Sequence, residues 1–354
     1  MSHAHRARRL AGLLAGVMLL VGTAAACGDS GSDTAAGTAA KSSASSDAFP
    51  VTIKHKFGST TIKSEPQRIV TIGLTDQDAV LALGKVPVAT TNWLGDYKGA
   101  IGPWAQDKLG SSAVPTVLKD TGTGPQIEKI AALKPDLIIA LYSALTKAQY
   151  QTLSKFAPVV AQPKEYNDYG IPWQQQTETI GKALGKADEA KKLVDGVEAK
   201  FAAAKAKYPA FAKATAVMAT PYEGIFVYGS QDPRSRLLSD LGFALPSGLD
   251  KVIGDSFGAN ISSERTDLLD QDVAVWIVPD TTTAVTKLHA TKLYGDLNVV
   301  KQGREVFIVE SSDYGNAVSL STVLSIPYVL DRLVPQLAAA VDGKTTTKVE
   351  QPAS

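Results

Sequence analysis

Aromatic and arginine side chains gather where predicted strands of the chain end. Ring faces stack on flat ligands, and the fork of an arginine donates paired hydrogen bonds to carboxylate or hydroxamate oxygens. Together these side chains are typical of a site for a bulky, partly aromatic, oxygen-rich anion. The candidate ligand-binding residues are Trp93, Tyr97, Tyr142, Tyr222, Arg234, Arg236 and Tyr314.

The sequence offers little for catalysis, for a protein-held metal or for nucleic acid. It contains no Gly-x-Ser-x-Gly elbow, no Walker-type phosphate loop and no His-Glu-x-x-His motif. Beyond residue 27 it has only His55 and His289, and its single cysteine is Cys27, so a disulfide framework or a Cys- or His-rich metal site is not expected. The formal net charge of +1 gives no basic footprint for nucleic acid. We therefore expect a binding protein that is not an enzyme and carries no cofactor.

The segments that must position the candidate residues predict two α/β halves. Short apolar runs alternate with helical patterns, and this alternation favours mostly parallel sheets. In the first half we expect a hairpin around Gly58-Ser59 within 51–62, strands at 68–72, 86–90, 136–140 and 158–161, and helices at 76–83 and 127–133. In the second half we expect strands at 215–220, 225–228, 273–278 and 305–309, and helices at 236–241 and 322–341.

A long helical pattern lies between the two halves. From Trp173 to Tyr208 apolar residues recur every three or four positions, which is the spacing of one buried stripe, and a helix of that length could run between two lobes. The predicted fold class is α/β, with two lobes that are each a mostly parallel sheet flanked by helices and that are joined by a single long helix. The predicted domains are an N-terminal lobe at 49–172, an interlobe helix at 173–208, a C-terminal lobe at 209–342 and a polar tail at 343–354.

The ends of the predicted strands indicate where a ligand would sit. In open parallel sheets, ligands bind beyond the carboxyl ends of the strands. Tyr142 directly follows one predicted strand, and Arg234 and Arg236 lie in a loop after another. Trp173 and Trp276 instead open a helix and lie within a buried strand pattern, so we expect both to be structural.

The N-terminus predicts export and lipidation. Arg6, Arg8 and Arg9 precede an apolar run that ends in small residues just before Cys27, which is typical of a signal peptide at 1–26. The residues before Cys27 resemble a lipobox, although Ala24 stands where leucine is usual. We expect Cys27 to be lipidated, residues 27–48 to be a flexible linker, and the protein to be anchored in the cell envelope at the outer face of the cytoplasmic membrane. The alternative is an ordinary signal peptide that happens to contain a cysteine.

Four ordered segments resemble one known family. They are PQRIVTIGLTDQDAVLALGKVPVATT at 66–91, PQIEKIAALKPDLIIA at 125–140, YGSQDPRSRLLSDLGF at 228–243 and ISSERTDLLDQDVAVWIV at 261–278. They resemble substrate-binding proteins of ABC importers for ferric siderophores, haem and vitamin B12. The resemblance implies two α/β lobes, a ligand held between them, and a monomer that docks on a membrane permease. Glu128 and Glu264 match the glutamates that each lobe of that family presents to permease arginines, where charge-assisted hydrogen bonds would orient the receptor.

The identity of the ligand stays open at this point. A ferric siderophore fits best, because a chelator already fills the coordination sphere of the iron and leaves only its outer oxygens to be recognised. Haem or cobalamin is the alternative ligand, and Tyr142, Tyr222 or Tyr314 could serve as an axial ligand for haem. A third reading is an envelope scaffold or sensor that keeps the receptor fold. The receptor reading gains over the scaffold reading if Tyr142, Tyr222 and the arginines converge across the gap between the lobes, and it loses if they scatter.

Overall fold

The computed structural model describes residues 48–119, 124–342 and 344–350. The predicted signal peptide, Cys27 and nearly all of the predicted linker lie outside the described residues. Among the described residues no single helix is long and apolar enough to cross a membrane. The two apolar helices near the C-terminus pass such a test only as a pair bent by 113°.

An antiparallel hairpin opens the fold, as predicted. It consists of β1 (Val51–His55) and β2 (Gly58–Ile62), and His55 pairs with Gly58. Lys56 and Phe57 therefore form the turn, two residues earlier than the sequence suggested. Gly58 begins β2 with a φ of 129°, which explains why a glycine stands there.

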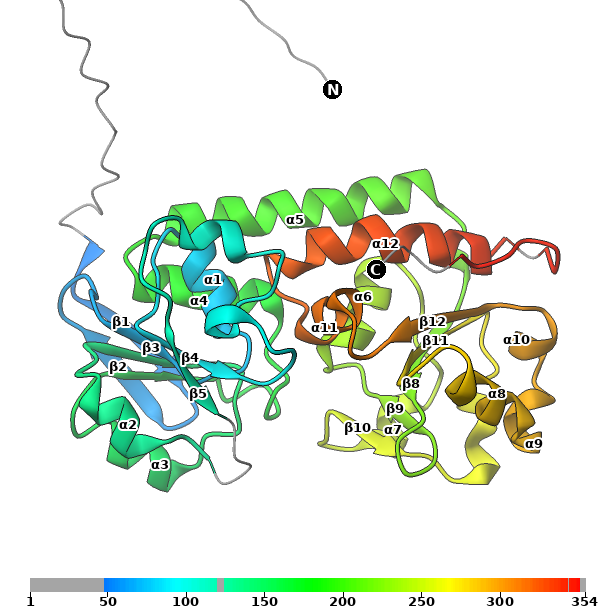
Figure 1. Ribbon diagram of the computed structural model, residues 1–354, viewed down its shortest axis with the longest axis horizontal. Helices are drawn as coiled ribbons and strands as arrows, with labels where there is room; N and C mark the ends of the chain where they lie inside the picture. Colours follow the sequence, from blue (N-terminus) through cyan, green and yellow to red (C-terminus); the bar gives the residue numbers. More distant parts are fainter. Residues whose placement is uncertain (1–47, 120–123, 343, 351–354) are drawn as a thin grey trace, which may run out of the picture. The chain divides into compact units, whose positions relative to one another are not determined.

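The first sheet is entirely parallel and has the strand order β5-β4-β3-β6-β7. Residues of the three strands β3, β6 and β7 are all buried, as expected for strands covered on both faces. The edge strand β5 was not predicted, because three of its four residues are exposed or polar and leave no apolar run. The bounds are β3 (Ile69–Thr71), β4 (Ala89–Asn92), β5 (Thr116–Lys119), β6 (Leu137–Ala140) and β7 (Val159–Ala161). Its helices are α1 (Asp76–Ala82), α2 (Ile127–Ala132) and α3 (Lys147–Leu153) (Figure 1).

The second sheet has the order β10-β9-β8-β11-β12 and is mixed. Strands β8, β11 and β12 are parallel, whereas β9 and β10 are antiparallel to their neighbours. The predicted parallel arrangement is therefore found among β8, β11 and β12, whereas β9 runs antiparallel because the connection at 221–225 is too short for a crossover. The bounds are β8 (Ala216–Thr220), β9 (Phe226–Tyr228), β10 (Gly258–Asn260), β11 (Val273–Val278) and β12 (Glu305–Val309).

Seven helices accompany the second sheet among the described residues. The five helices α7 to α11 were not predicted, and the helix predicted at 322–341 begins three residues later. The bounds are α6 (Pro233–Asp240), α7 (Leu249–Ile253), α8 (Thr283–Ala290), α9 (Lys292–Gly295), α10 (Asn298–Lys301), α11 (Asp313–Leu320) and α12 (Ser325–Ala340).

The long helix predicted at 173–208 is in fact two helices. Helix α4 (Trp173–Ala183) and helix α5 (Ala187–Lys207) are separated by a break in which Gly185 has a φ of 68°. A side chain at Gly185 would also collide with the Phe49 ring, 2.6 Å from the ideal Cβ position. The two helices pack side by side, and α5 alone is the long helix that joins the lobes (Figure 1). The apolar stripe continued across the break, so periodicity gave no sign of it.

Two tryptophans have the structural roles that were predicted. The Trp276 side chain is wholly buried in β11. Trp173 is 5% exposed and stacks on Phe201 of α5, and its indole nitrogen donates a hydrogen bond to Asp240 on α6.

Candidate functional site

A pocket of about 210 Å³ lies between the two lobes. The first lobe contributes an aliphatic and three aromatic side chains, and the second contributes an arginine and a phenylalanine. The lining residues are Leu74, Trp93, Tyr142, Tyr169, Arg234 and Phe257.

The aromatic wall of this pocket comes mainly from the first lobe. The Trp93 and Tyr142 ring centroids are 6.3 Å apart, and Tyr142 meets Tyr169 edge to face at 5.5 Å. On the opposite side, Phe257 is 40% exposed and packs against Phe226 at 5.7 Å. A ligand between the lobes would therefore meet ring faces on both sides.

A buried carboxylate fixes the backbone from which Tyr142 projects. Asp76 of α1 accepts hydrogen bonds from the backbone nitrogens of Leu141 at 2.8 Å and Tyr142 at 3.1 Å, and from the Gln176 amide at 2.6 Å. Burial raises the pKa of Asp76, although these hydrogen bonds act in the opposite direction. Gly73 leaves the space that the carboxylate needs, because a Cβ there would stand 2.0 Å from an Asp76 oxygen.

The arginine of the pocket is held by a carboxylate two residues before it. Arg234 donates from Nε and Nη2 to the two oxygens of Asp232, both at 2.7 Å. Asp232 also caps the N-terminus of α6 by accepting from the Arg234 backbone nitrogen. The guanidinium lies 4.0 Å from the Tyr228 ring centroid. Burial alone would lower the pKa of Arg234, but the ion pair with Asp232 outweighs it and raises the pKa.

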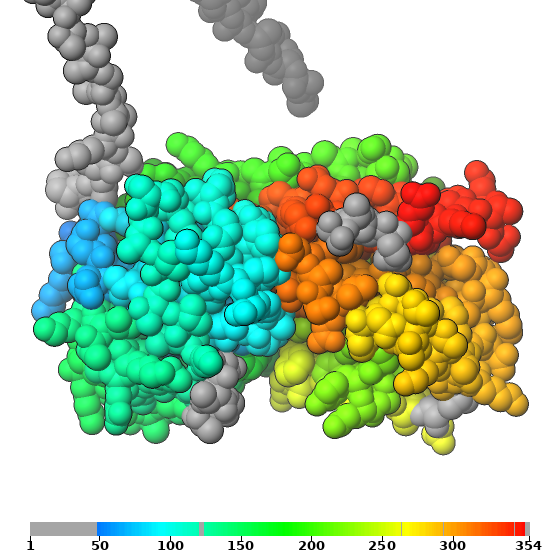
Figure 2. Space-filling model, viewed as in Figure 1, coloured from blue at the N-terminus to red at the C-terminus, as the bar shows by residue number. Residues whose placement is uncertain are grey.

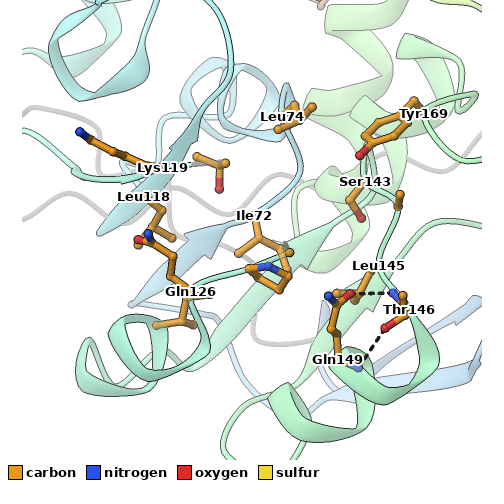
Figure 3. Close-up of a pocket in the computed structure, with 15 residues that line it drawn as sticks. Ile72, Leu74, Leu118, Lys119, Gln126, Ser143, Leu145, Thr146, Gln149 and Tyr169 are labelled. Atoms are coloured by element: carbon orange, nitrogen blue, oxygen red, sulfur yellow. Dashed lines mark hydrogen bonds between the residues drawn. The ribbon is translucent and has the colours of Figure 1, made fainter. Parts of the chain in front are cut away.

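Two further pockets continue along the carboxyl edge of the first sheet. One, of about 380 Å³, shares Leu74 and Tyr169 with the interlobe pocket, and Figure 3 shows Ser143, Gln126 and Tyr169 around it. The other, of about 570 Å³, shares Trp93. The strand ends of the first sheet therefore line one extended cleft, as the rule for parallel sheets predicts.

Hydrogen bonds between the lobes close one side of the molecule. Tyr97 donates to Asp313 at 2.7 Å and accepts from the Asn316 amide at 2.8 Å, and burial together with Asp313 raises the pKa of Tyr97 to about 12. Trp104 and Tyr328 meet nearby with ring centroids 6.0 Å apart. Figure 2 shows this junction, where cyan residues of the first lobe abut orange residues of the second. Tyr97 therefore joins the lobes and lines the pocket beside Trp93.

The structure brings three of the predicted ligand-binding residues together, namely Trp93, Tyr142 and Arg234. Tyr222 does not join them: it lies in the turn between antiparallel strands β8 and β9 and is 61% exposed. Tyr314 was also misplaced by the sequence analysis, since the first turn of α11 directs it into the core, where its hydroxyl donates to Gln336.

Arg236 lies on α6, close to the pocket but not in its lining. It is partly buried, its Nη1 has no hydrogen-bond partner, and burial lowers its pKa. The two arginines thus have different surroundings, which no pattern in the sequence distinguishes.

Glu128 and Glu264 are both exposed, one on each lobe. Glu128 lies in the first turn of α2, and Glu264 lies in a short 3-10 helix at Ser263–Leu268. Among the described residues, no group of three His, Cys, Asp or Glu side chains is arranged to hold a metal ion.

Three residues that matter at the site were missed in the sequence analysis. Tyr169 lies in the loop after β7, and reading the end of that predicted strand would have found it. Phe257 precedes β10, an edge strand too short and too polar to be recognised. The Asp-Pro pair at 232–233 is a helix-start signal that could have indicated a buried Asp232 beside Arg234.

Comparisons with known proteins agree on one family. The family model described as periplasmic binding protein matches residues 69–310, which is more than half of the chain. A periplasmic solute binding protein from Mycobacterium smegmatis has a crystal structure that superposes with a TM-score of 0.70 at 32% identity, covering 82% of this chain and 98% of that one. The PiaA protein of Streptococcus pneumoniae, solved in complex with ferrichrome, gives a TM-score of 0.71 at 28% identity and covers 83% and 99%. The Fe(3+)-citrate-binding protein YfmC of Bacillus subtilis is 28% identical over 248 residues, 70% of this chain and 74% of that protein.

Proposed function

The chain belongs to the periplasmic binding protein family, and from this premise we propose that it captures a ferric siderophore complex and delivers it to an ABC importer for iron uptake. Its part in the process is binding and presentation, without a chemical step. Relatives named for Fe(3+)-citrate, ferric anguibactin and ferric enterobactin support this ligand type.

The interlobe pocket is the observation that carries the proposal. It combines ring faces from both lobes with one arginine, and its aromatic wall is held by buried hydrogen bonds before any ligand arrives. A chelate presents carbon surface and outer oxygens, which such rings and hydrogen-bond donors can recognise. Because preformed walls need little reordering, the cost of binding is low.

Attachment and docking complete the proposal. We propose that Cys27 carries the lipid anchor, that the protein works as a monomer at the outer face of the cytoplasmic membrane, and that Glu128 and Glu264 contact the permease. The exposure of both glutamates supports this role. A family member of Bacillus subtilis, provisionally named as an ABC transporter substrate-binding lipoprotein, is 27% identical over 92% of this chain, which supports the lipid anchor.

Two measurements test the proposed function together. The first is equilibrium dialysis of the detergent-solubilised full chain with ⁵⁵Fe chelates, which should show saturable binding of one ferric chelate. The same chelator without iron should bind more weakly. Cells that lack the gene should take up that ⁵⁵Fe chelate more slowly. If a folded protein binds no ferric chelate of the hydroxamate, catecholate or citrate type, the proposal is wrong.

A matched pair of aromatic variants locates the binding. Phe257→Ala removes an exposed ring from the interlobe pocket, whereas Tyr222→Ala removes an exposed ring of the same lobe outside it. We expect the first to weaken binding about fivefold, in line with roughly 1 kcal/mol for a lost aromatic contact, and the second to leave it unchanged. Equal effects of the two changes would place the ligand elsewhere.

A further inference from the structure

The interlobe pocket has a cationic side chain but no spare positive charge. Arg234 is the only ionisable cation in its lining, and both oxygens of buried Asp232 are engaged with it. Asp232 is completely buried and Arg234 is 7% exposed, so solvent does little to separate the two charges. Arg234 therefore offers hydrogen-bond donors to a ligand while its charge is already balanced.

The next arginine along α6 lies outside the lining of the interlobe pocket. Burial lowers the pKa of this arginine, Arg236, although the carboxylates of Asp232 and Asp240 act in the opposite direction. Besides burial, the Glu310 carboxylate contributes to the raised pKa of Tyr228, whose ring centroid lies 4.0 Å from the Arg234 guanidinium.

The rest of the cleft is nearly free of charge among the described residues. In the pocket of about 380 Å³, Lys119 is the one charged side chain of the fifteen that line it, and Figure 3 shows it extending away from the other labelled residues. Lys119 also lines the pocket of about 570 Å³ beside Trp93, and the lining of that pocket includes Asp96 as well. The remaining lining consists of aliphatic and aromatic groups, hydroxyls and amides.

We propose that the ligand is an electrically neutral ferric chelate, of the tris-hydroxamate class. This inference rests on the proposed function and adds the chemical class of the ligand. Three hydroxamates balance the charge of ferric iron, whereas tris-catecholate and citrate complexes are anionic. An anion would lose its hydration in the interlobe pocket without gaining an unpaired cation from the lining of that pocket, and that loss is costly. The neutral chelate needs only ring contacts and hydrogen-bond donors such as Arg234. The proposed ligand therefore differs from the anion that side-chain types alone suggested.

Titrations of the detergent-solubilised full chain with three ferric chelates test the proposal. Ferrichrome represents the neutral tris-hydroxamates, and ferric enterobactin and ferric citrate represent the anionic classes. We expect ferrichrome to bind at least tenfold more tightly than either anion, with a Kd that changes little between low and high salt. Tighter binding of an anionic chelate would overturn this inference and leave the proposed function standing. Binding of none of them would overturn both.

The charge of Arg234 can be unmasked by one substitution. Asp232→Asn keeps the size and the helix-capping ability of the residue but removes its charge. We expect the preference for ferrichrome over ferric citrate to fall about tenfold in this variant. Asp272→Asn is the matched control, because Asp272 pairs with Arg304 at 3.0 Å in the same lobe outside the cleft lining, and it should leave the preference unchanged. An unchanged preference in folded Asp232→Asn would contradict the proposal.

A charge series on one chelate separates charge from shape, and it needs no variant. Ferrioxamine B carries a pendant amine that can be left free, acetylated or succinylated, which gives a positive, a neutral and a negative complex with the same iron core. We expect the succinylated form to bind at least tenfold more weakly than the acetylated form. Equal or tighter binding of the succinylated form would show that the cleft does not select against negative charge.

Discussion

Thr322 donates a hydrogen bond to Asp78, although 244 positions separate the two residues in the sequence. Asp78 belongs to α1 of the first lobe, and Thr322 lies between α11 and α12 of the second. The same Asp78 oxygen accepts from the Trp104 indole nitrogen at 2.8 Å. One buried carboxylate therefore links the two lobes.

Removing the Thr322 hydroxyl should weaken this tie. We expect Thr322→Val to lower the free energy of unfolding by about 1–2 kcal/mol, because a buried hydrogen bond is lost while the shape is nearly kept. Thr286→Val is the control, since the Thr286 hydroxyl bonds to a carbonyl of its own helix at an exposed site. Urea denaturation measures both, and equal midpoints for the two variants would refute a special role for Thr322.

The stability of the protein should depend on pH through Asp78. Burial raises its pKa from the ordinary 3.8 to about 6, although the hydrogen bonds from Thr322 and Trp104 lower it. The folded state thus binds this proton more tightly than the unfolded state does. The resulting stabilisation is fully present below 3.8 and is lost as the pH rises through 6.

Asp78→Asn isolates that effect, because the amide resembles the protonated acid. The unfolding free energy of wild type minus that of Asp78→Asn should decrease by about 3 kcal/mol at most as the pH is raised from acid to neutral. Denaturation series at several pH values measure the difference, in which other titrating groups cancel. A difference that stays constant or increases with pH would contradict the assignment.

The space at Gly73 should control both stability and ligand binding. Gly73→Ala pushes the Asp76 carboxylate away from the backbone of Leu141 and Tyr142, so we expect a loss of about 2 kcal/mol or more and weaker binding of the chelate. Gly196→Ala in the exposed middle of α5 meets no atom within 4 Å and should instead add up to about 1 kcal/mol. The proposal for Gly73 fails if its alanine variant is as stable as wild type.

The two exposed glutamates should act in transport and leave binding intact. We expect the double change Glu128→Ala and Glu264→Ala to reduce uptake of ⁵⁵Fe chelate at least tenfold with an unchanged Kd, because charge-assisted contacts to the permease are lost. The control with the same change in charge is Glu189→Ala with Glu198→Ala on the exposed face of α5. Full uptake in the first double variant would exclude a docking role.

Sequence patterns revealed the buried parts of this fold better than its edges. Strands such as β6 were found because Leu137–Ala140 is wholly buried and apolar, whereas β5 at Thr116–Lys119 lies at a sheet edge and has three exposed residues of four. The break at Gly185 was invisible because the apolar stripe continues on both sides of it. The order of buried strands and helices along the chain could therefore be predicted from the sequence. The direction of strands and the breaks in helices could not, because they depend on contacts with distant residues.

The candidate site was only partly predictable for the same reason. Tyr142 and Tyr314 both come shortly after a strand, yet Tyr142 faces the pocket and Tyr314 bonds to Gln336 in the core. The direction of a side chain depends on the first turn that follows the strand. The balance of charge at Arg234 likewise depends on the rotamer that brings its guanidinium back onto Asp232, which no residue pattern specifies.

Each sheet is built from one uninterrupted part of the sequence. All strands of the first sheet fall within 69–161 and all strands of the second within 216–309, with α5 as the connection between them. As the chain is synthesised from its N-terminus, the first sheet can thus pair completely before any strand of the second exists. Neither sheet includes a strand from the other half of the sequence. The entropy cost of loop closure during sheet formation therefore comes only from the loops between strands of the same sheet.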